Sequence, residues 1–171
     1  MVVWITGPSA VGKTAVGERL WRLWKERAPN VVLVDGDAMR QIFGTGSDPA
    51  AFAPAGRRAN AERIVEICRW LDAQGVHVVC CILAIFDDIL ERNRGLFSGY
   101  LEVRLSAPHG VLAARDPKGL YRKALAGEMA NVVGIDIPYA LRSTPDLSFD
   151  TAGAASADEI ARSIIEALSR S

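Results

Sequence analysis

Gly7-Pro-Ser-Ala-Val-Gly-Lys-Thr14 is the stretch that decides the fold, because it matches the phosphate-binding pattern G-x-x-x-x-G-K-[ST]. It follows the β-branched and aromatic run Val2–Thr6, which predicts a buried strand. It precedes residues 15–27, where apolar side chains recur at helical spacing. Small residues between a strand and a helix let backbone N–H groups surround phosphates at the positive end of the helix dipole. The sequence therefore predicts a nucleoside triphosphate site near its start.

The residues of this loop have separate chemical tasks. The ammonium group of Lys13 supplies a point charge to the β- and γ-phosphate oxygens, and the Thr14 hydroxyl is a ligand for Mg²⁺. A GTPase would also need the guanine-reading pattern Asn-Lys-x-Asp, which the sequence lacks. ATPases of the motor or recombinase type need a longer sheet, so a small kinase fits best. Within the loop, we expect ATP to contact Gly7, Ser9, Ala10, Val11, Gly12, Lys13, Thr14 and Ala15.

Composition and charge exclude several classes of protein. Half of the residues are hydrophobic, which excludes intrinsic disorder. The length of 171 residues predicts one domain, spanning residues 1–171. Lys plus Arg and Asp plus Glu number 20 each, and zero net charge argues against binding long nucleic acids or membrane surfaces. The longest apolar run, Val78–Phe86, is too short to cross a membrane, which takes about 20 residues. With no signal peptide or cysteine framework, a cytoplasmic protein is expected.

Short apolar runs alternate with amphipathic stretches along the whole chain. This alternation predicts an α/β fold of the P-loop NTPase, nucleotide-kinase type: a three-layer αβα sandwich around a mostly parallel, five-stranded sheet. Residues 43–54 are expected to form a loop, and residues 116–145 a mobile lid over the site. Further strands are expected at 31–34, 76–85, 100–105 and 147–149, and further helices at 59–74, 87–96, 108–115 and after Ser156.

Two carboxylates, Asp35 and Asp37, follow the buried run Val31–Val34. Ligands of open α/β sheets gather at the carboxyl ends of the strands, so we expect both carboxylates near the transferred phosphate. One can hold the Mg²⁺ shell and the other can accept the proton of an attacking hydroxyl, and the pattern leaves open which does which. The alternative is that they only cap the turn between a strand and a helix.

Beyond the phosphate-binding loop, the sequence resembles adenylylsulfate (APS) kinases almost end to end. Asp35-Gly-Asp-Ala-Met-Arg40 resembles their D-G-D-N-x-R, and Arg57 with Asn60 resembles their R-x-x-N. Their most specific signature, R-D-P-K-G-L-Y-x-K-A, is matched by residues 115–124, which begin Arg-Asp-Pro-Lys-Gly-Leu-Tyr. Shorter matches occur at residues 134–136, 138–139 and 150–151.

The resemblance implies transfer of the γ-phosphate of ATP to the ribose 3′-hydroxyl of a small nucleotide, which is adenylyl sulfate in that family. It makes Asp37 the favoured base and implies catalytic roles for Lys13, Asp35 and Lys118, with Thr14 and Asp35 as Mg²⁺ ligands. The adenine of ATP would lie against Arg115, Thr151, Ala152 and Ala154. The acceptor would contact Asp37, Arg40, Phe52, Arg57, Asn60, Leu83, Lys118, Gly119, Leu120 and Val132.

Two departures from the family pattern fall in the acceptor pocket. Leu83-Ala-Ile-Phe-Asp87 replaces I-S-P-[YF]-R, so a carboxylate stands where a cation is expected. Asn131-Val-Val-Gly-Ile-Asp136 replaces G-F-T-G-I-D, which removes an aromatic wall worth about 1–3 kcal/mol of base stacking. The second variant resembles a subgroup found with capsular polysaccharide biosynthesis, some of whose members phosphorylate cytidine diphosphoramidate.

The sequence therefore predicts a kinase whose acceptor, adenylyl sulfate or cytidine diphosphoramidate, is left open. We expect a small nucleotide as its partner, with neither nucleic acid nor a membrane, and a homodimer is left open. The rival hypothesis is a nucleotide-binding sensor without turnover. The altered segment 84–87 supports the sensor, whereas the intact base candidate and lid sequence argue against it.

Overall fold

Five parallel strands lie at the centre of the molecule, in the order β2-β3-β1-β4-β5. The structure is a computed structural model that describes residues 1–153 and 155–170. The predicted parallel, five-stranded sheet is confirmed, and Val3 of its central strand pairs with Val79 on one side and Leu101 on the other. The strands are β1 (Val2–Thr6), β2 (Val31–Asp35), β3 (His77–Cys81), β4 (Tyr100–Ser106) and β5 (Leu147–Asp150).

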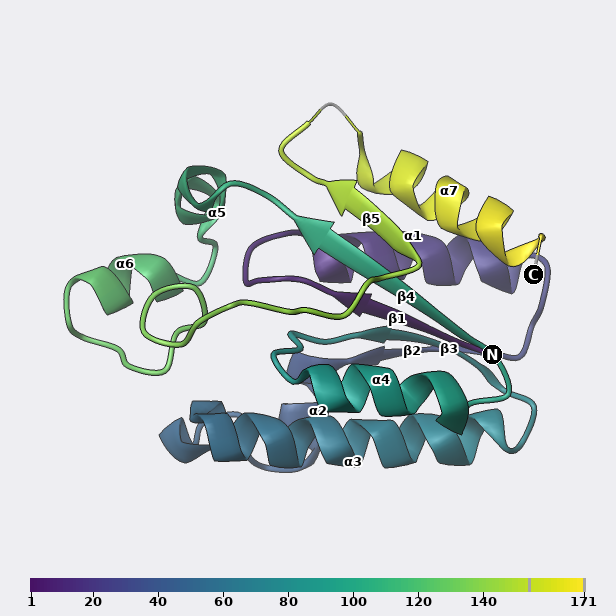
Figure 1. Cartoon of the computed structure of the whole chain (residues 1–171), viewed down its shortest axis with the longest axis horizontal. Helices are drawn as coiled ribbons and strands as arrows, with labels where there is room; N and C mark the ends of the chain where they lie inside the picture. Colours follow the sequence, from purple (N-terminus) through teal and green to yellow (C-terminus); the bar gives the residue numbers. More distant parts are fainter. Residues whose placement is uncertain (154, 171) are drawn as a thin grey trace.

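Helices cover both faces of the sheet, because successive side chains of a strand point to opposite faces. Val3 and Ile5 of β1 pack in the core beneath α1 (Lys13–Lys25) and α7 (Ala157–Leu168). Val2 and Trp4 pack in the other core, against α3 (Pro54–Asp72) and α4 (Asp87–Leu96). Figure 1 shows the two helical layers on either side of the sheet, which confirms the three-layer sandwich.

The end of β2 differs from the sequence expectation, because a helix, α2 (Gly36–Ile42), begins directly after the strand. The Asp35 carboxylate caps this helix by accepting hydrogen bonds from the backbone N–H groups of Asp37 (2.9 Å) and Ala38 (3.2 Å). The expected loop 43–54 contains a short 3₁₀ turn, η1 (Pro49–Phe52), and α3 already begins at Pro54. Proline suits the first position of a helix because its missing N–H would be unpaired there.

Strand β3 is shorter than the expected 76–85, since it ends at Cys81. Its neighbours β1 and β2 end at Thr6 and Asp35 and turn into other elements, so residues beyond 81 have no continuing ladder. The predicted start of the last helix is confirmed, because Ser156 and Glu159 form a reciprocal capping box. Among the described residues, no helix is long and apolar enough to cross a membrane.

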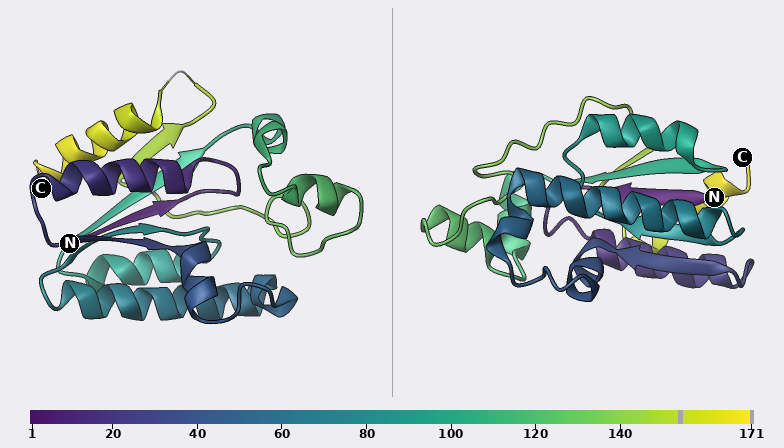
Figure 2. Two further views of the ribbon diagram at one scale, coloured as in Figure 1. Left: turned by 180° about the vertical axis from the view of Figure 1, so that it is seen from behind. Right: turned by 90° about the horizontal axis from the view of Figure 1, so that it is seen from below.

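The segment 116–145 first extends beyond the carboxyl ends of the strands, at the opposite end of the molecule from the N-terminus, and then runs back along the sheet to the start of β5 (Figures 1 and 2). It follows α5 (His109–Arg115) and contains α6 (Leu120–Leu125). Its position over the carboxyl edge of the sheet is the one that a lid requires, and both the lid and the single-domain organisation stay predictions.

Candidate active site

A cavity of about 520 Å³ opens at the carboxyl ends of β1, β2 and β3. The phosphate-binding loop forms one wall, the start of α2 a second, and the lid segment a third. Fifteen residues singled out from the sequence line it: Ser9, Ala10, Gly12, Lys13, Thr14, Ala15, Asp35, Asp37, Arg40, Phe52, Arg57, Leu83, Lys118, Leu120 and Val132.

The phosphate-binding loop is closed by its own lysine. The Lys13 ammonium donates hydrogen bonds to the backbone carbonyl oxygens of Gly7 (3.0 Å) and Pro8 (2.7 Å). Burial lowers the pKa of Lys13 to about 8, although Cys81, Asp37 and Asp35 act in the opposite direction. Gly7 has φ of 153°, and a Cβ there would lie 2.6 Å from the carbonyl oxygen of Leu105. The loop therefore requires glycine at its first position.

Thr14 and Asp35 bring two oxygen groups together beside the loop. The Thr14 hydroxyl donates to Asp35 Oδ2 at 2.9 Å, while Asp35 Oδ1 caps α2. No cluster of three or more His, Cys, Asp or Glu in the described part of the chain could enclose a metal ion. One carboxylate and one hydroxyl nevertheless suit Mg²⁺, which prefers oxygen ligands and keeps its remaining positions for water and phosphate.

Asp37 forms an ion pair with Lys118, which reaches it from the lid segment. Burial alone would raise the pKa of Asp37, but the hydrogen bond and charge of Lys118, with Arg40 and Lys13, lower it below its ordinary value. The Arg40 guanidinium lies 3.4 Å from the other carboxylate oxygen. Asp37 is therefore ionised at neutral pH, as a general base must be.

Two arginines and one aromatic ring line another part of the cavity. The guanidinium carbons of Arg40 and Arg57 lie 5.0 and 5.8 Å from the centre of the Phe52 ring. Arg57 also donates to the carbonyl oxygens of Phe52 (2.6 Å) and Asn131 (2.8 Å), so it links α3 to the segment 116–145. Burial, together with the charge of Arg40, lowers the pKa of Arg57 to about 10. Both groups stay cationic at neutral pH and can bind an anion.

Asn60 is almost completely buried, with 2% of its surface exposed, and it does not line the cavity. Neither polar atom of its side chain has a hydrogen-bond partner within the described residues. Gly119, the N-cap residue before α6 with φ of 64°, also lies outside the lining. These two acceptor contacts stay predictions.

The residues expected near the adenine of ATP lie together outside the cavity. Arg115 donates to the Thr151 hydroxyl (3.1 Å) and to its carbonyl oxygen (2.6 Å), so the end of α5 contacts the turn after β5. The Ala152 N–H in that turn donates to Asp150 at 2.8 Å. Ala154 falls outside the described residues. The structure thus brings Arg115, Thr151 and Ala152 together from segments far apart in the sequence.

Comparison with known proteins identifies the family. Residues 1–150 match the sequence profile described as adenylylsulphate kinase. In the structure of the Mycobacterium tuberculosis APS kinase CysC in complex with AMPPNP and APS, 96% of that chain superposes on 98% of this one, with a TM-score of 0.86 and 31% identity. The chain belongs to the APS kinase family. It is therefore a phosphotransferase with an alcohol group as acceptor.

Relatives within the APS kinase family carry different names. A cytidine diphosphoramidate kinase of Campylobacter jejuni is 34% identical over 138 residues, which are 81% of this chain and 79% of that one. The bifunctional enzyme NodQ of Azospirillum brasilense is 35% identical over 171 residues, and the chain spans 27% of NodQ's length. Identities this close to one another leave the acceptor undecided.

The cavity of this APS kinase relative also has lining residues that sequence reasoning missed. Asp116 and Pro117 lie inside the signature 115–124, and Asn131 and Val133 lie beside the altered aromatic position, so a signal was present for these four. The rest owe their place to the folding of α2, β3 and the lid. Missed lining residues are Gly36, Gln41, Gly46, Cys81, Asp116, Pro117, Met129, Ala130, Asn131 and Val133.

Cys81 is the one of these with a nucleophilic side chain. Its thiol donates to the Lys13 carbonyl oxygen at 3.4 Å and is 2% exposed as a residue. Burial, with the negative charge of Asp35, raises the pKa of Cys81 to about 12. The thiol is therefore protonated at neutral pH and serves as a packing residue beneath the phosphate-binding loop.

Proposed function

We propose that this enzyme transfers the γ-phosphate of ATP, bound with Mg²⁺, to the 3′-hydroxyl of a small nucleotide. The observation that carries the proposal is the convergence of Lys13, Asp37 and Lys118 on one cavity. These side chains come from the phosphate-binding loop, from α2 and from the lid, so a donor phosphate and an acceptor hydroxyl can meet between them. We propose a single domain, residues 1–171, with residues 116–145 as its lid.

Each group has a role that its surroundings support. Asp37 would accept the proton of the attacking hydroxyl, and Lys118 and Arg40 keep it ionised for that task. Lys13 would exchange its two carbonyl partners for phosphate oxygens, whose negative charge it neutralises. Thr14 and Asp35 would hold Mg²⁺, which supplies positive charge to the phosphates when bound.

Adenylyl sulfate is the acceptor that we propose first, with 3′-phosphoadenylyl sulfate as the product. The structure of the M. tuberculosis relative was determined with APS, and its chain is similar to this one over almost its whole length. Arg40 and Arg57 offer cations to an anionic nucleotide, and Phe52 offers a ring on which a base can stack. A sulfate assimilation role would follow from this acceptor.

Cytidine diphosphoramidate is the second candidate, which would place the enzyme in capsular polysaccharide biosynthesis. Two observations favour it over a purine nucleotide carrying sulfate. The wall at residue 132 is the aliphatic, largely buried Val132, which cannot stack on a base. Residue 87 is an aspartate, so the cation expected there to bind a sulfate is missing.

The test is incubation of the protein with ATP, MgCl₂ and either adenylyl sulfate or cytidine diphosphoramidate, followed by ³¹P NMR and mass spectrometry. A 3′-phosphorylated product from either nucleotide, absent with Lys13→Ala, supports the kinase and identifies the acceptor. Tight ATP binding without product from either acceptor or from a wider nucleotide panel would instead indicate a sensor. ATP hydrolysis without an acceptor, unaffected by Asp37→Asn, would contradict the proposed reaction.

A further inference from the structure

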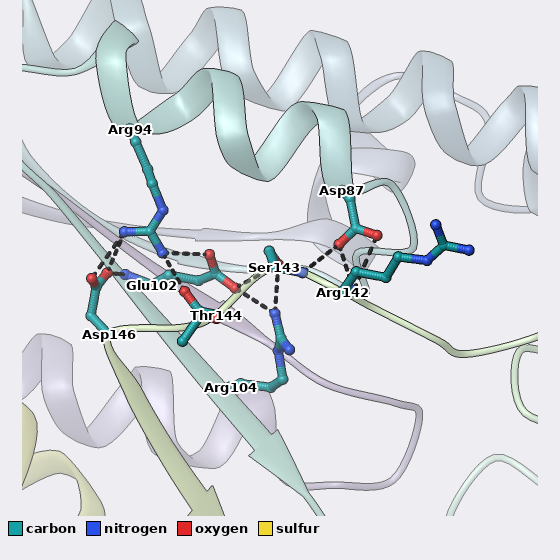
Figure 3. Close-up of polar contacts among 8 residues, drawn as sticks. All are labelled: Asp87, Arg94, Glu102, Arg104, Arg142, Ser143, Thr144 and Asp146. Carbon is teal, nitrogen blue, oxygen red and sulfur yellow. Dashed lines mark hydrogen bonds and ion pairs between the residues drawn. The ribbon is translucent and has the colours of Figure 1, made fainter.

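The carboxylate of Asp87 is occupied by the backbone of another segment. Figure 3 shows it at the start of α4, facing residues 142 and 143. Its two oxygens accept from the Arg142 N–H at 2.9 and 3.1 Å, and one of them also accepts from the Ser143 N–H at 3.0 Å. An arginine at position 87 would present donors to these donors. The carboxylate at position 87 therefore suits the two N–H donors that lie opposite it, and an arginine would not.

Residues 142–146, which we name the strap, form the end of the lid segment just before β5 and are held at their other end as well. Asp146 accepts from the Arg94 guanidinium at 2.9 and 3.1 Å and from the Glu102 N–H at 2.7 Å. Arg94 also donates to the Thr144 carbonyl oxygen at 2.9 Å. These contacts fasten the strap to α4 and β4 (Figure 3).

A buried glutamate organises the second attachment. Glu102 is completely buried in the sheet and accepts from Arg94 (2.9 Å) and Arg104 (2.8 Å). Arg104 donates to the Ser143 hydroxyl at 2.7 Å, so the same charge cluster reaches the residue that Asp87 binds. A buried carboxylate needs such partners because its desolvation is costly. The strap thus lies between an anchor at Asp87 and an anchor at Glu102.

The strap sits where it can control the acceptor side of the cavity. Leu83, four residues before Asp87, lines that cavity, as do Val132 and Val133 of the lid. Residues 134–141 connect these valines to the strap, and Leu141 within them packs against the core under α3 and α4. By contrast, the phosphate-binding loop is complete without any residue of this region.

We propose that Asp87 is a positioning residue: by holding the strap, it fixes the end of the lid and with it the wall formed by Val132 and Val133. The inference rests on the proposed kinase reaction, whose acceptor it concerns. Releasing the strap adds conformational freedom that acceptor binding must then remove, so the effect falls on acceptor binding. It also explains why residue 87 has no cation for the ligand.

Hydrogen exchange tests the anchor with no nucleotide present. We expect Asp87→Ala to expose the amides of residues 142 and 143 to exchange at least about tenfold faster, as lost local contacts do. Asp88→Ala is the matched control, because Asp88 is the next residue of the same helix turn but pairs with Arg58. Asp87→Asn, which retains an acceptor oxygen, should keep part of the protection and guards against a variant that fails to fold. Unchanged exchange in Asp87→Ala would overturn the proposal.

Steady-state kinetics tests the consequence for the reaction. We expect Asp87→Ala to raise the KM for the acceptor by about tenfold, with the KM for ATP changed by less than about twofold. Equal rises in both constants would show a merely structural role and overturn the proposal. Asp87→Arg should behave like Asp87→Ala; a lower KM for adenylyl sulfate would instead make residue 87 a ligand contact. If the wild-type protein transfers no phosphate but Asp87→Ala still exchanges faster than wild type at residues 142 and 143, the proposed function is rejected and the anchor is supported.

Discussion

The phosphate-binding loop and the lid face one another across the same cavity, but they are held in place by contacts of different range. Lys13 closes the loop by bonding Gly7, six residues away. The lid contacts join residues separated by 81 positions at Asp37 and Lys118, and by 55 at Asp87 and Arg142. The half that we propose to bind the donor can therefore stay constant while substitutions far away alter the half that we propose to bind the acceptor.

The largest expected effect is at Asp37, the proposed general base, which would act between the donor half and the acceptor half of the cavity. We expect Asp37→Asn to lower kcat by about 10³-fold, because an amide cannot accept the proton of the acceptor hydroxyl. ATP affinity should be maintained, since the phosphate-binding loop is untouched, and isothermal titration calorimetry measures it. Asp48→Asn is the control, because Asp48 caps η1 and does not line the cavity. A retained kcat in Asp37→Asn would move the base role to Asp35.

The next effect tests how much the buried charge cluster at Glu102, which holds the strap, contributes to the free energy of unfolding. Glu102→Ala leaves two arginines without their buried partner, and we expect it to lower the free energy of unfolding by about 3–5 kcal/mol. Glu91→Ala, at an exposed glutamate of α4, should change the stability little. Denaturant unfolding measures both. A loss below about 1 kcal/mol for Glu102→Ala would show that the charge cluster is dispensable.

A smaller effect tests whether Phe52, in the acceptor half, stacks on the base of the acceptor nucleotide. Phe52→Ala should weaken acceptor binding by about 1–3 kcal/mol, which is seen as a higher acceptor KM at unchanged ATP KM. Phe43→Ala is matched to it, since the Phe43 ring also lies under an arginine, Arg63, at 5.6 Å and lies outside the cavity. If the two substitutions raised the acceptor KM equally, Phe52 would not be part of the acceptor site.

The smallest effect concerns the donor half and pH. The pKa of Lys13 is lowered to about 8 by burial, so free protein loses this proton as the pH rises through 8. Bound phosphates favour the charged form and raise the pKa, so ATP binding near pH 8.5 should take up a fraction of a proton and weaken at higher pH. Calorimetry in buffers of different ionisation enthalpy measures the uptake. Lys13→Arg, always charged, should show none; equal uptake in it would contradict the assignment.

Much of this molecule follows from its sequence because the determining interactions are local. The phosphate-binding loop and the capping box at Ser156 depend on residues within a few positions of one another, and local apolar runs indicate the five strands, although neighbouring strands decide where β3 ends. The sequence left open whether Asp35 caps a helix or holds a metal ion, since a carboxylate suits both, and in the structure Asp35 accepts hydrogen bonds from both Ala38 and Thr14.

Only the tertiary structure decided what the acceptor side looks like. The sequence shows a carboxylate at position 87 in place of a cation, and this change alone suggests a lost anion site. Folding brings the N–H groups of Arg142 and Ser143 opposite it, which turns the same carboxylate into an anchor for the lid. Such pairings depend on how α4, β4 and the lid pack together, and no spacing in the sequence encodes that packing.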